Sequence, residues 1–176
     1  MKVLAVSGSL RADSYNTRLL EAAAAAAPAG VEVELLDPAL IADLPLYDQD
    51  LEDEEVPASV DLLREAWAGA DAILFATPEY NGSVPGGLKN AIDWASRPRL
   101  EAALANKTVT VIGASTGQFG ALWAQNDLRR ILGIAGARVV GEALPVARAQ
   151  DGLAEATRAA LRSQLDLLVE ATGVPA

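Results

Sequence analysis

The residues of this 176-residue chain that are best suited to chemistry lie in three polar, glycine-containing segments. The first segment covers residues 7–17 and reads SGSLRADSYNT. Its hydroxyl and amide side chains are neutral hydrogen-bonding groups, and Arg11 carries a guanidinium that suits a phosphate. The segment lies between an apolar run and a helical one, where free backbone N–H groups favour an anion. We therefore interpret it as a candidate phosphate-binding loop.

The same segment also has a purely structural interpretation. Ser, Asp and Asn are the residues that most often cap the start of a helix, so these side chains are equally typical of a cap. The spacing matches neither Gly-x4-Gly-Lys-Ser/Thr nor Gly-x-Gly-x-x-Gly, which excludes the two common nucleotide-binding motifs. Asp13 would repel a phosphate, so we expect its side chain to turn outward.

The second segment covers residues 77–94 and reads TPEYNGSVPGGLKNAIDW. Pro78 and the pair Asn81-Gly82 predict a rigid turn directly after a buried strand. The backbone N–H and C=O groups of such a turn can read the edge of a planar heterocycle, and Tyr80 is placed to flank it. The alternative is an ordinary connection between a strand and a helix. Trp94 is expected to pack rather than to react.

The third segment covers residues 113–120 and reads GASTGQFG. Its small residues allow a ligand to approach the backbone closely, and Ser115 and Thr116 offer hydroxyl groups. On its own, this pattern is typical of a flexible loop. Taken together, a phosphate loop, a rigid turn and a small-residue loop after neighbouring strands predict a mononucleotide site with a flat base.

The composition excludes several other classes of site. The chain has no histidine and no cysteine, so Ser-His-Asp and Cys-His nucleophiles, zinc sites and disulfides are all ruled out. Its 24 acidic and 14 basic residues give a net charge of -10, which opposes binding to nucleic acid or to anionic lipid. No apolar run approaches the ~20 residues of a membrane span, and MKVLAV is too short for a signal peptide. We expect a cytoplasmic protein with neither nucleic-acid nor membrane partners.

Apolar runs of strand length alternate along the chain with segments of helical period. Strands are expected at 2–6, 31–36, 72–77, 108–113 and, with a weaker pattern, 138–143. Helices are expected at 17–27, 59–68, 85–94, 121–134 and 153–169. Residues 37–55 are rich in proline and acid, and we expect them to form an irregular, solvated and mobile loop.

This alternation predicts an α/β fold with a parallel sheet covered on both faces. Five strands joined by right-handed crossovers predict a flavodoxin-like three-layer sandwich with the strand order 2-1-3-4-5. A helical bundle is the alternative for an alanine-rich chain, but residues 31–36 and 108–112 are bounded by turn residues and rich in β-branched side chains. No repeat or linker is visible, so residues 1–176 are expected to form a single domain.

Two of the three segments resemble the motifs of a known family. Residues 8–16, GSLRADSYN, are similar to the phosphate signature of NADPH-dependent FMN reductases. Residues 78–94, PEYNGSVPGGLKNAIDW, are similar to the flavin turn of the same family. The alternating pattern supports the resemblance over nearly the whole chain. The family includes flavin, quinone, azo-dye and chromate reductases.

The resemblance implies non-covalently bound FMN, with its phosphate on the first segment and its ring between the other two. The residues implied are Ser9, Arg11, Ser14, Asn16 and Thr17 for the phosphate, Pro78, Glu79, Tyr80 and Asn81 for the isoalloxazine, and Ser115, Thr116 and Gly117 for its other side. NADPH or NADH would pass hydride to the flavin, which would reduce a quinone, flavin, azo or metal-oxyanion acceptor in a ping-pong cycle. No catalytic side chain is implied, because the cofactor carries the chemistry.

Two other functions fit the same residues. A flavodoxin-type electron carrier would lack a nicotinamide site, and a nucleotide-sensing module would bind without turnover. Flavodoxins hold the phosphate with a loop that lacks a Leu-Arg pair, so Leu10-Arg11 argues against a carrier. The resemblance also implies a homodimer or homotetramer with the flavin near the interface. Apolar residues in the helices at 85–94 and 121–134 agree with this, or else pack only on their own sheet.

Overall fold

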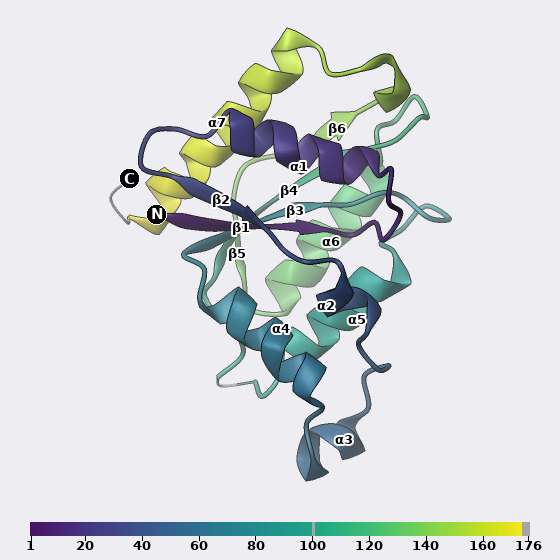
Figure 1. Cartoon of the computed structure of the whole chain (residues 1–176), viewed down its shortest axis with the longest axis vertical. Coiled ribbons are helices and arrows are strands. Elements are labelled where there is room, and N and C mark those ends of the chain that lie inside the picture. Colours follow the sequence, from purple (N-terminus) through teal and green to yellow (C-terminus); the bar gives the residue numbers. More distant parts are fainter. Residues whose placement is uncertain (100, 174–176) are drawn as a thin grey trace.

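Helices and strands alternate along the chain in the computed structural model, which describes residues 1–99 and 101–173 (Figure 1). The strands are β1 (Lys2–Ser7), β2 (Glu32–Leu35), β3 (Ala72–Ala76), β4 (Thr108–Ala114), β5 (Arg138–Val139) and β6 (Leu144–Val146). The helices are α1 (Tyr15–Ala25), α2 (Ala39–Ala42), α3 (Gln49–Glu54), α4 (Ala58–Ala68), α5 (Gly86–Ala95), α6 (Leu122–Ile134) and α7 (Glu155–Thr172), with a short 3-10 helix at Ala149–Asp151.

The strands form one parallel sheet in the order β2-β1-β3-β4-β5, and β6 also pairs with β4. This confirms the predicted order 2-1-3-4-5. Strand β1 lies between β2 and β3, so the sheet grows in opposite directions from it. In open α/β sheets, ligands bind beyond the carboxyl ends of the strands at such a reversal.

Two hydrophobic clusters cover the two faces of the sheet. Successive strand residues point to opposite faces, so Leu4 and Val6 pack in the cluster of α4, α5 and α6, whereas Val3 and Ala5 pack in that of α1 and α7. Figure 1 shows α1 and α7 on one side of the strands and α4 and α5 on the other. The predicted three-layer sandwich is therefore confirmed.

The last predicted strand, residues 138–143, is wrong in its extent. Strand pairing with β4 stops after Val139 and resumes at Leu144, which makes a sixth strand. Between them, Gly141 has a φ of 66°, and its carbonyl accepts a hydrogen bond of 2.6 Å from the guanidinium of Arg129. Where the chain leaves the sheet, a side chain of α6 thus bonds to its backbone, a contact that local strand propensity does not reveal.

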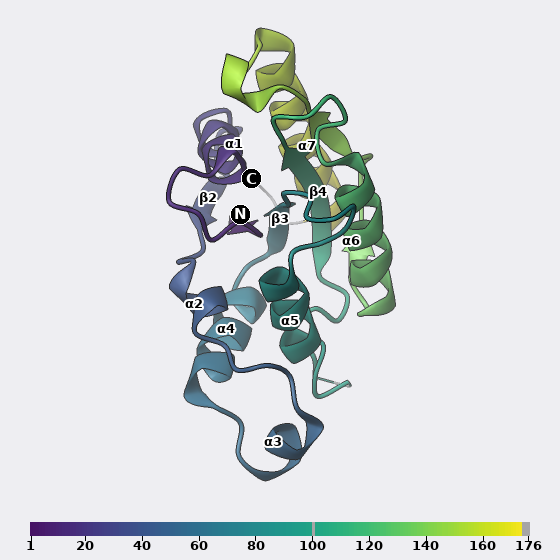
Figure 2. The same cartoon turned by 90° about the vertical axis from the view of Figure 1, so that its right-hand side faces the viewer.

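The prediction of an irregular, solvated loop over residues 37–55 is wrong in part: most of the segment is exposed, but it is not irregular throughout. Helices α2 and α3 form within it, and Figure 2 shows α3 far from the sheet. Two side chains of α5 hold the segment: Asn90 donates to the carbonyl of Pro45 and accepts from the N–H of Tyr47, both at 2.8 Å. Trp94 donates to the same Pro45 carbonyl at 2.9 Å, and its buried ring meets Tyr47 edge-on. The predicted packing role of Trp94 is thus confirmed.

Helix α1 begins at Tyr15, two positions before the predicted start at residue 17. Ser14 is its cap, because the Ser14 hydroxyl oxygen accepts hydrogen bonds from the N–H groups of Asn16 and Thr17. The other predicted helices lie at the expected places and differ only at their ends. Within the described part of the chain, no helix is both long and apolar enough to cross a membrane.

We expect Asn90→Ala to loosen the 37–55 segment without disturbing the sheet. Losing two hydrogen bonds to the backbone should lower the free energy of unfolding by about 1–3 kcal/mol, measured by urea denaturation. Hydrogen exchange at the Tyr47 amide should accelerate. Asn126→Ala, at an exposed position of α6, is the matched control and should leave both unchanged. Unaltered exchange at Tyr47 in Asn90→Ala would contradict this account of the anchor.

Candidate functional site

The loops that follow β1, β3 and β4 meet at the carboxyl edge of the sheet, around a cavity of about 390 Å³. This volume lies within the ~300–1,000 Å³ that is usual for small-molecule sites. All the predicted site residues line the cavity except Thr17, Asn81 and Gly117. The lining residues are Ser9, Arg11, Ser14, Tyr15, Asn16, Pro78, Glu79, Tyr80, Ala114, Ser115 and Thr116.

Two of these lining residues, Tyr15 and Ala114, were not predicted as site residues from the sequence. Tyr15 lies between two predicted site residues, so its position in the loop was the available signal. Ala114 ends β4 directly before Ser115, and only its backbone bonds to the rest of the site. Alanine carries no chemical signal, so only the fold identifies it.

The first loop presents a helix start and one cation to the cavity. Ser14 lines the cavity while capping α1, so both sequence interpretations of this loop apply to the same residue. Its oxygen accepts from the helix, which leaves the hydroxyl proton free to be donated. The guanidinium of Arg11 lies 5.4 Å from the ring centre of Tyr15, and none of the described carboxylates forms an ion pair with it.

Asp13 turns away from the cavity, as predicted. Its side chain is 84% exposed, and its carboxylate lies 3.5 Å from the guanidinium of Arg18. The acidic residue of the first loop is thereby paired with another cation. The loop keeps a local positive charge although the chain as a whole is acidic.

Asn16 and Thr17 use their side chains inside the protein. The buried Asn16 amide donates to the carbonyl of Ala114 at 3.0 Å and accepts from the N–H of the same residue at 2.9 Å. The Thr17 hydroxyl donates to Ser7 Oγ at 3.1 Å. Asn16 therefore ties the start of α1 to the end of β4. The hydrogen bonds of its side chain go to backbone, so its part in the site is to place the loops.

The turn after β3 is a short hairpin that is fastened to α6. Tyr80 and Ser83 exchange two backbone hydrogen bonds of 3.1 Å, and Asn81 and Gly82 between them have φ values of 53° and 77°. Positive φ at both central residues is the geometry that the Asn-Gly pair favours. Asn81 is thus exposed at the tip of the hairpin, outside the lining of the cavity.

Glu79 joins this turn to α6. Its Oε2 accepts hydrogen bonds from the N–H groups of Trp123 and Ala124, at 3.1 and 3.2 Å. A second contact lies nearby, where the Ser83 hydroxyl donates to Asp127 at 2.8 Å. The rigid turn predicted from sequence is therefore present, and part of its rigidity comes from a helix that the sequence pattern did not connect to it.

The third loop is held by the chain that follows β6. The Ser115 N–H donates to the carbonyl of Val146, and the Ser115 carbonyl accepts from the N–H of Ala149, both at 3.0 Å. Gly120 has a φ of 56°, and a Cβ there would lie 2.6 Å from the backbone nitrogen of Val146. These contacts fasten both ends of the loop to the rest of the protein. Thr116 is exposed on the wall of the cavity.

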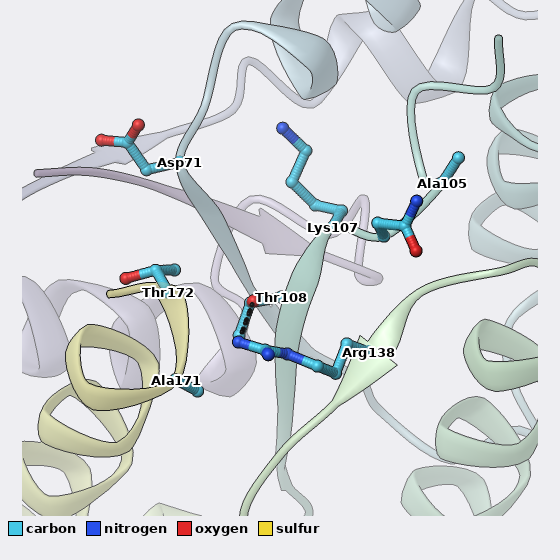
Figure 3. Close-up of a pocket in the computed structure, with 8 residues that line it drawn as sticks. Asp71, Ala105, Lys107, Thr108, Arg138, Ala171 and Thr172 are labelled. Atoms are coloured by element: carbon cyan, nitrogen blue, oxygen red, sulfur yellow. Dashed lines mark hydrogen bonds between the residues drawn. The ribbon is translucent and has the colours of Figure 1, made fainter. Parts of the chain in front are cut away.

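A second hollow of about 390 Å³ lies at the opposite, amino edge of the sheet (Figure 3). The Lys107 ammonium donates to the carbonyls of Ala68 and Ala70, and the Arg138 guanidinium to the hydroxyl of Thr108. Burial lowers the pKa of Lys107 below its ordinary value. In Figure 3 the two basic side chains run in different directions. They bond to backbone and hydroxyl groups at the ends of helices and strands and do not point toward a common centre. The cavity at the carboxyl edge is therefore the candidate site.

Comparison with known proteins agrees with this choice. Residues 1–151 match the family model described as NADPH-dependent FMN reductase. The chain belongs to this family. The residues of all three loops of the cavity lie within the matched range, which confirms the resemblance drawn from the sequence.

Relatives within the family have related activities. An NAD(P)H-dependent FMN reductase of Pseudomonas aeruginosa is 48% identical over 132 residues, 75% of this chain and 69% of the relative. A quinone reductase of Escherichia coli K12 is 46% identical over 133 residues, with the same coverage. The flavoenzyme FerB of Paracoccus denitrificans, an NAD(P)H:(acceptor) oxidoreductase, has a TM-score of 0.81 at 34% identity and covers 96% of this chain and 97% of its own. These relatives support the predicted pairing of FMN with NAD(P)H.

We expect Asn16→Ala to weaken the apoprotein as well as the site. Two buried backbone groups of Ala114 would lose their partner, so urea unfolding without flavin should show a loss of about 1–3 kcal/mol. Gln118→Ala, at an exposed position of the third loop, should change stability by less than about 0.5 kcal/mol. If Asn16→Ala is as stable as the wild type, the amide does not hold the loops together.

Proposed function

We propose that the protein is an FMN-dependent NAD(P)H oxidoreductase that reduces a small acceptor of the quinone type. The observation that carries the proposal is the cavity at the carboxyl edge. One end combines a helix start with a guanidinium that has no acidic partner among the described residues, and the other is walled by a rigid turn and a small-residue loop. This arrangement fits a phosphorylated planar cofactor at both ends.

The phosphate end is built from neutral donors and one cation. Ser9 and Ser14 are 6% and 2% exposed, so their hydroxyls are close to the protein interior, while Arg11 reaches outward. We assign the phosphate to the Ser9, Arg11 and Ser14 side chains and to the N-terminus of α1, where backbone dipoles favour an anion. Asn16 and Thr17 contribute by holding this loop in place.

The ring end is built mainly from backbone. Pro78 is buried, and the hairpin keeps the peptide groups of Glu79 and Tyr80 on the wall of the cavity. We assign the isoalloxazine to the turn of residues 78–81 on one side. On the other side we assign it to Ser115, Thr116 and Gly117. Peptide N–H and C=O groups in a fixed turn select a ring by its pattern of donors and acceptors.

Bound FMN would supply the redox chemistry, that is, hydride and electron transfer between NAD(P)H and the acceptor. The chain's own residues bind and orient the reactants. Tyr80 is 53% exposed beside the cavity, which leaves room for a planar co-substrate to reach the ring. Among acceptors we favour quinones, because relatives at 46% identity are quinone reductases. Flavin, azo and metal-oxyanion acceptors, and assembly as a homodimer or homotetramer, remain predictions.

Anaerobic mixing of the flavin-loaded protein with NADPH tests the activity. We expect rapid bleaching of the visible flavin absorbance, return of the colour on adding a quinone, and parallel lines in double-reciprocal plots of a steady-state assay. A yellow protein that NADPH and NADH both fail to bleach would instead be an electron carrier or a sensing module. A protein that stays colourless after incubation with FMN would contradict flavin binding altogether.

Arg11→Ala tests the phosphate end. Loss of a charged hydrogen bond should weaken FMN binding by about 1.5–3 kcal/mol, roughly 10- to 150-fold in Kd, measured by fluorescence titration. Riboflavin, which has no phosphate, should bind both proteins equally. Arg158→Ala is the matched control, because Arg158 is an exposed arginine of α7 that does not line the cavity. Equal FMN affinity in Arg11→Ala and Arg158→Ala would show that Arg11 does not bind the phosphate.

A further inference from the structure

Two helices begin at the carboxyl edge of the sheet beside the cavity, and they are capped differently. Helix α1 is capped by a neutral hydroxyl, that of Ser14. Helix α6 is preceded by Ala121, which has a φ of 61° and no side chain able to cap. Its free N–H groups are instead bonded by the carboxylate of Glu79, a residue of the turn after β3. A charged cap therefore reaches α6 from a different part of the chain.

The Glu79 cap makes the two helix starts differ in their attraction for an anion. A helix N-terminus carries a partial positive charge that attracts anions, and each of the two starts offers one. At α6 the attraction is already satisfied by a carboxylate, and that negative charge repels a second anion. At α1 the neutral cap leaves the attraction in place, and Arg11 adds to it. The two helix starts thus differ in charge, and only α1 contributes residues to the lining of the cavity.

The contact between Glu79 and α6 also fixes the position of the turn after β3. Glu79 bonds to the first turn of α6, and Ser83 bonds to Asp127 farther along that helix. Between these two contacts, the hairpin bonds of Tyr80 and Ser83 close the tip. The peptide groups of residues 79 and 80 are therefore held against α6 from both sides, and they form the wall to which we assigned the ring.

We propose that the Glu79 side chain positions the wall for the flavin ring rather than binding the cofactor itself. Its carboxylate, seated on the N-terminus of α6, sets the backbone of residues 78–81, to which we assigned the ring. This inference rests on the proposed flavin function. It assigns to Glu79 a role that its place in the flavin turn does not reveal, since its side chain bonds to α6.

Flavins with and without a phosphate separate this role from the others. Wild type, Glu79→Ala, Glu79→Gln and Glu79→Asp apoproteins are titrated with FMN and with riboflavin. Glu79→Ala should weaken both flavins by a similar factor, about tenfold or more, because the wall that reads the ring is released. Glu79→Gln keeps an acceptor oxygen at the same reach and should stay within about threefold of wild type for riboflavin. Arg11→Ala, in contrast, should weaken FMN alone.

Two further variants control for stability and for the second contact. Leu168→Ala opens a cavity in the buried face of α7, and it should lower the stability of the fold without changing either flavin affinity. Ser83→Ala should weaken the binding of both flavins less than Glu79→Ala does.

The visible absorption spectrum of the bound flavin gives a second readout. The resolved shoulder of its absorption band should blur in Glu79→Ala and return in Glu79→Gln. If Glu79→Ala does not fold, Glu79→Asp carries the test, since its shorter carboxylate falls short of α6 and should weaken both flavins.

Three results would overturn the proposal. Glu79→Ala or Glu79→Asp with wild-type affinity for riboflavin would show that the turn does not need this contact. A loss confined to FMN would place the effect of Glu79 at the phosphate. An equal loss in Leu168→Ala would reduce the effect to general instability. Wild-type protein that binds neither flavin would overturn the proposed function itself, which distinguishes that failure from the other three.

Discussion

One buried amide holds the site together. Asn16 and Ala114 lie 98 positions apart in the sequence, and the two hydrogen bonds between them join the first turn of α1 to the last residue of β4. The Gly8 N–H adds a bond of 2.8 Å to the carbonyl of Ala76, which brings in the end of β3. The three loops follow three different strands. These hydrogen bonds hold them together as one surface before any ligand binds. Such preorganisation is what precise binding requires.

An acidic protein binds an anion only if its own carboxylates are directed elsewhere. The net charge is -10, yet both acidic residues on the loops around the cavity have other partners: Asp13 pairs with Arg18, and Glu79 caps α6. Arg11 is left without an acidic partner in the described chain. The local charge of the site is therefore set by a few pairings, and the overall charge acts mainly on solubility and on long-range approach.

Sequence patterns predicted the fold, the three loops and most of the cavity lining because those features are local. Unbroken apolar runs identify buried strands, Pro78 and Asn81-Gly82 identify a turn, and Ser14 identifies a helix start. The misjudged features depend on contacts between distant residues. Where the sheet breaks near Gly141, Arg129 bonds to the backbone carbonyl, and within residues 37–55 Asn90 and Trp94 bond to the carbonyl of Pro45. No local pattern reports which helix will supply such a partner.

The rotation of helix α5 about its axis determines its contacts with two regions, the core and residues 37–55. It follows directly from the hairpin, it buries Leu88 and Ile92 in the core, and it directs Asn90 and Trp94 at Pro45. One residue inserted between the hairpin and Asn90 would turn the rest of the helix by ~100°. The core face and the anchoring face would then both be lost. The number of residues between the hairpin and Asn90 therefore cannot change without loss of both faces. A substitution that keeps this number affects only the contacts of the side chain that it replaces.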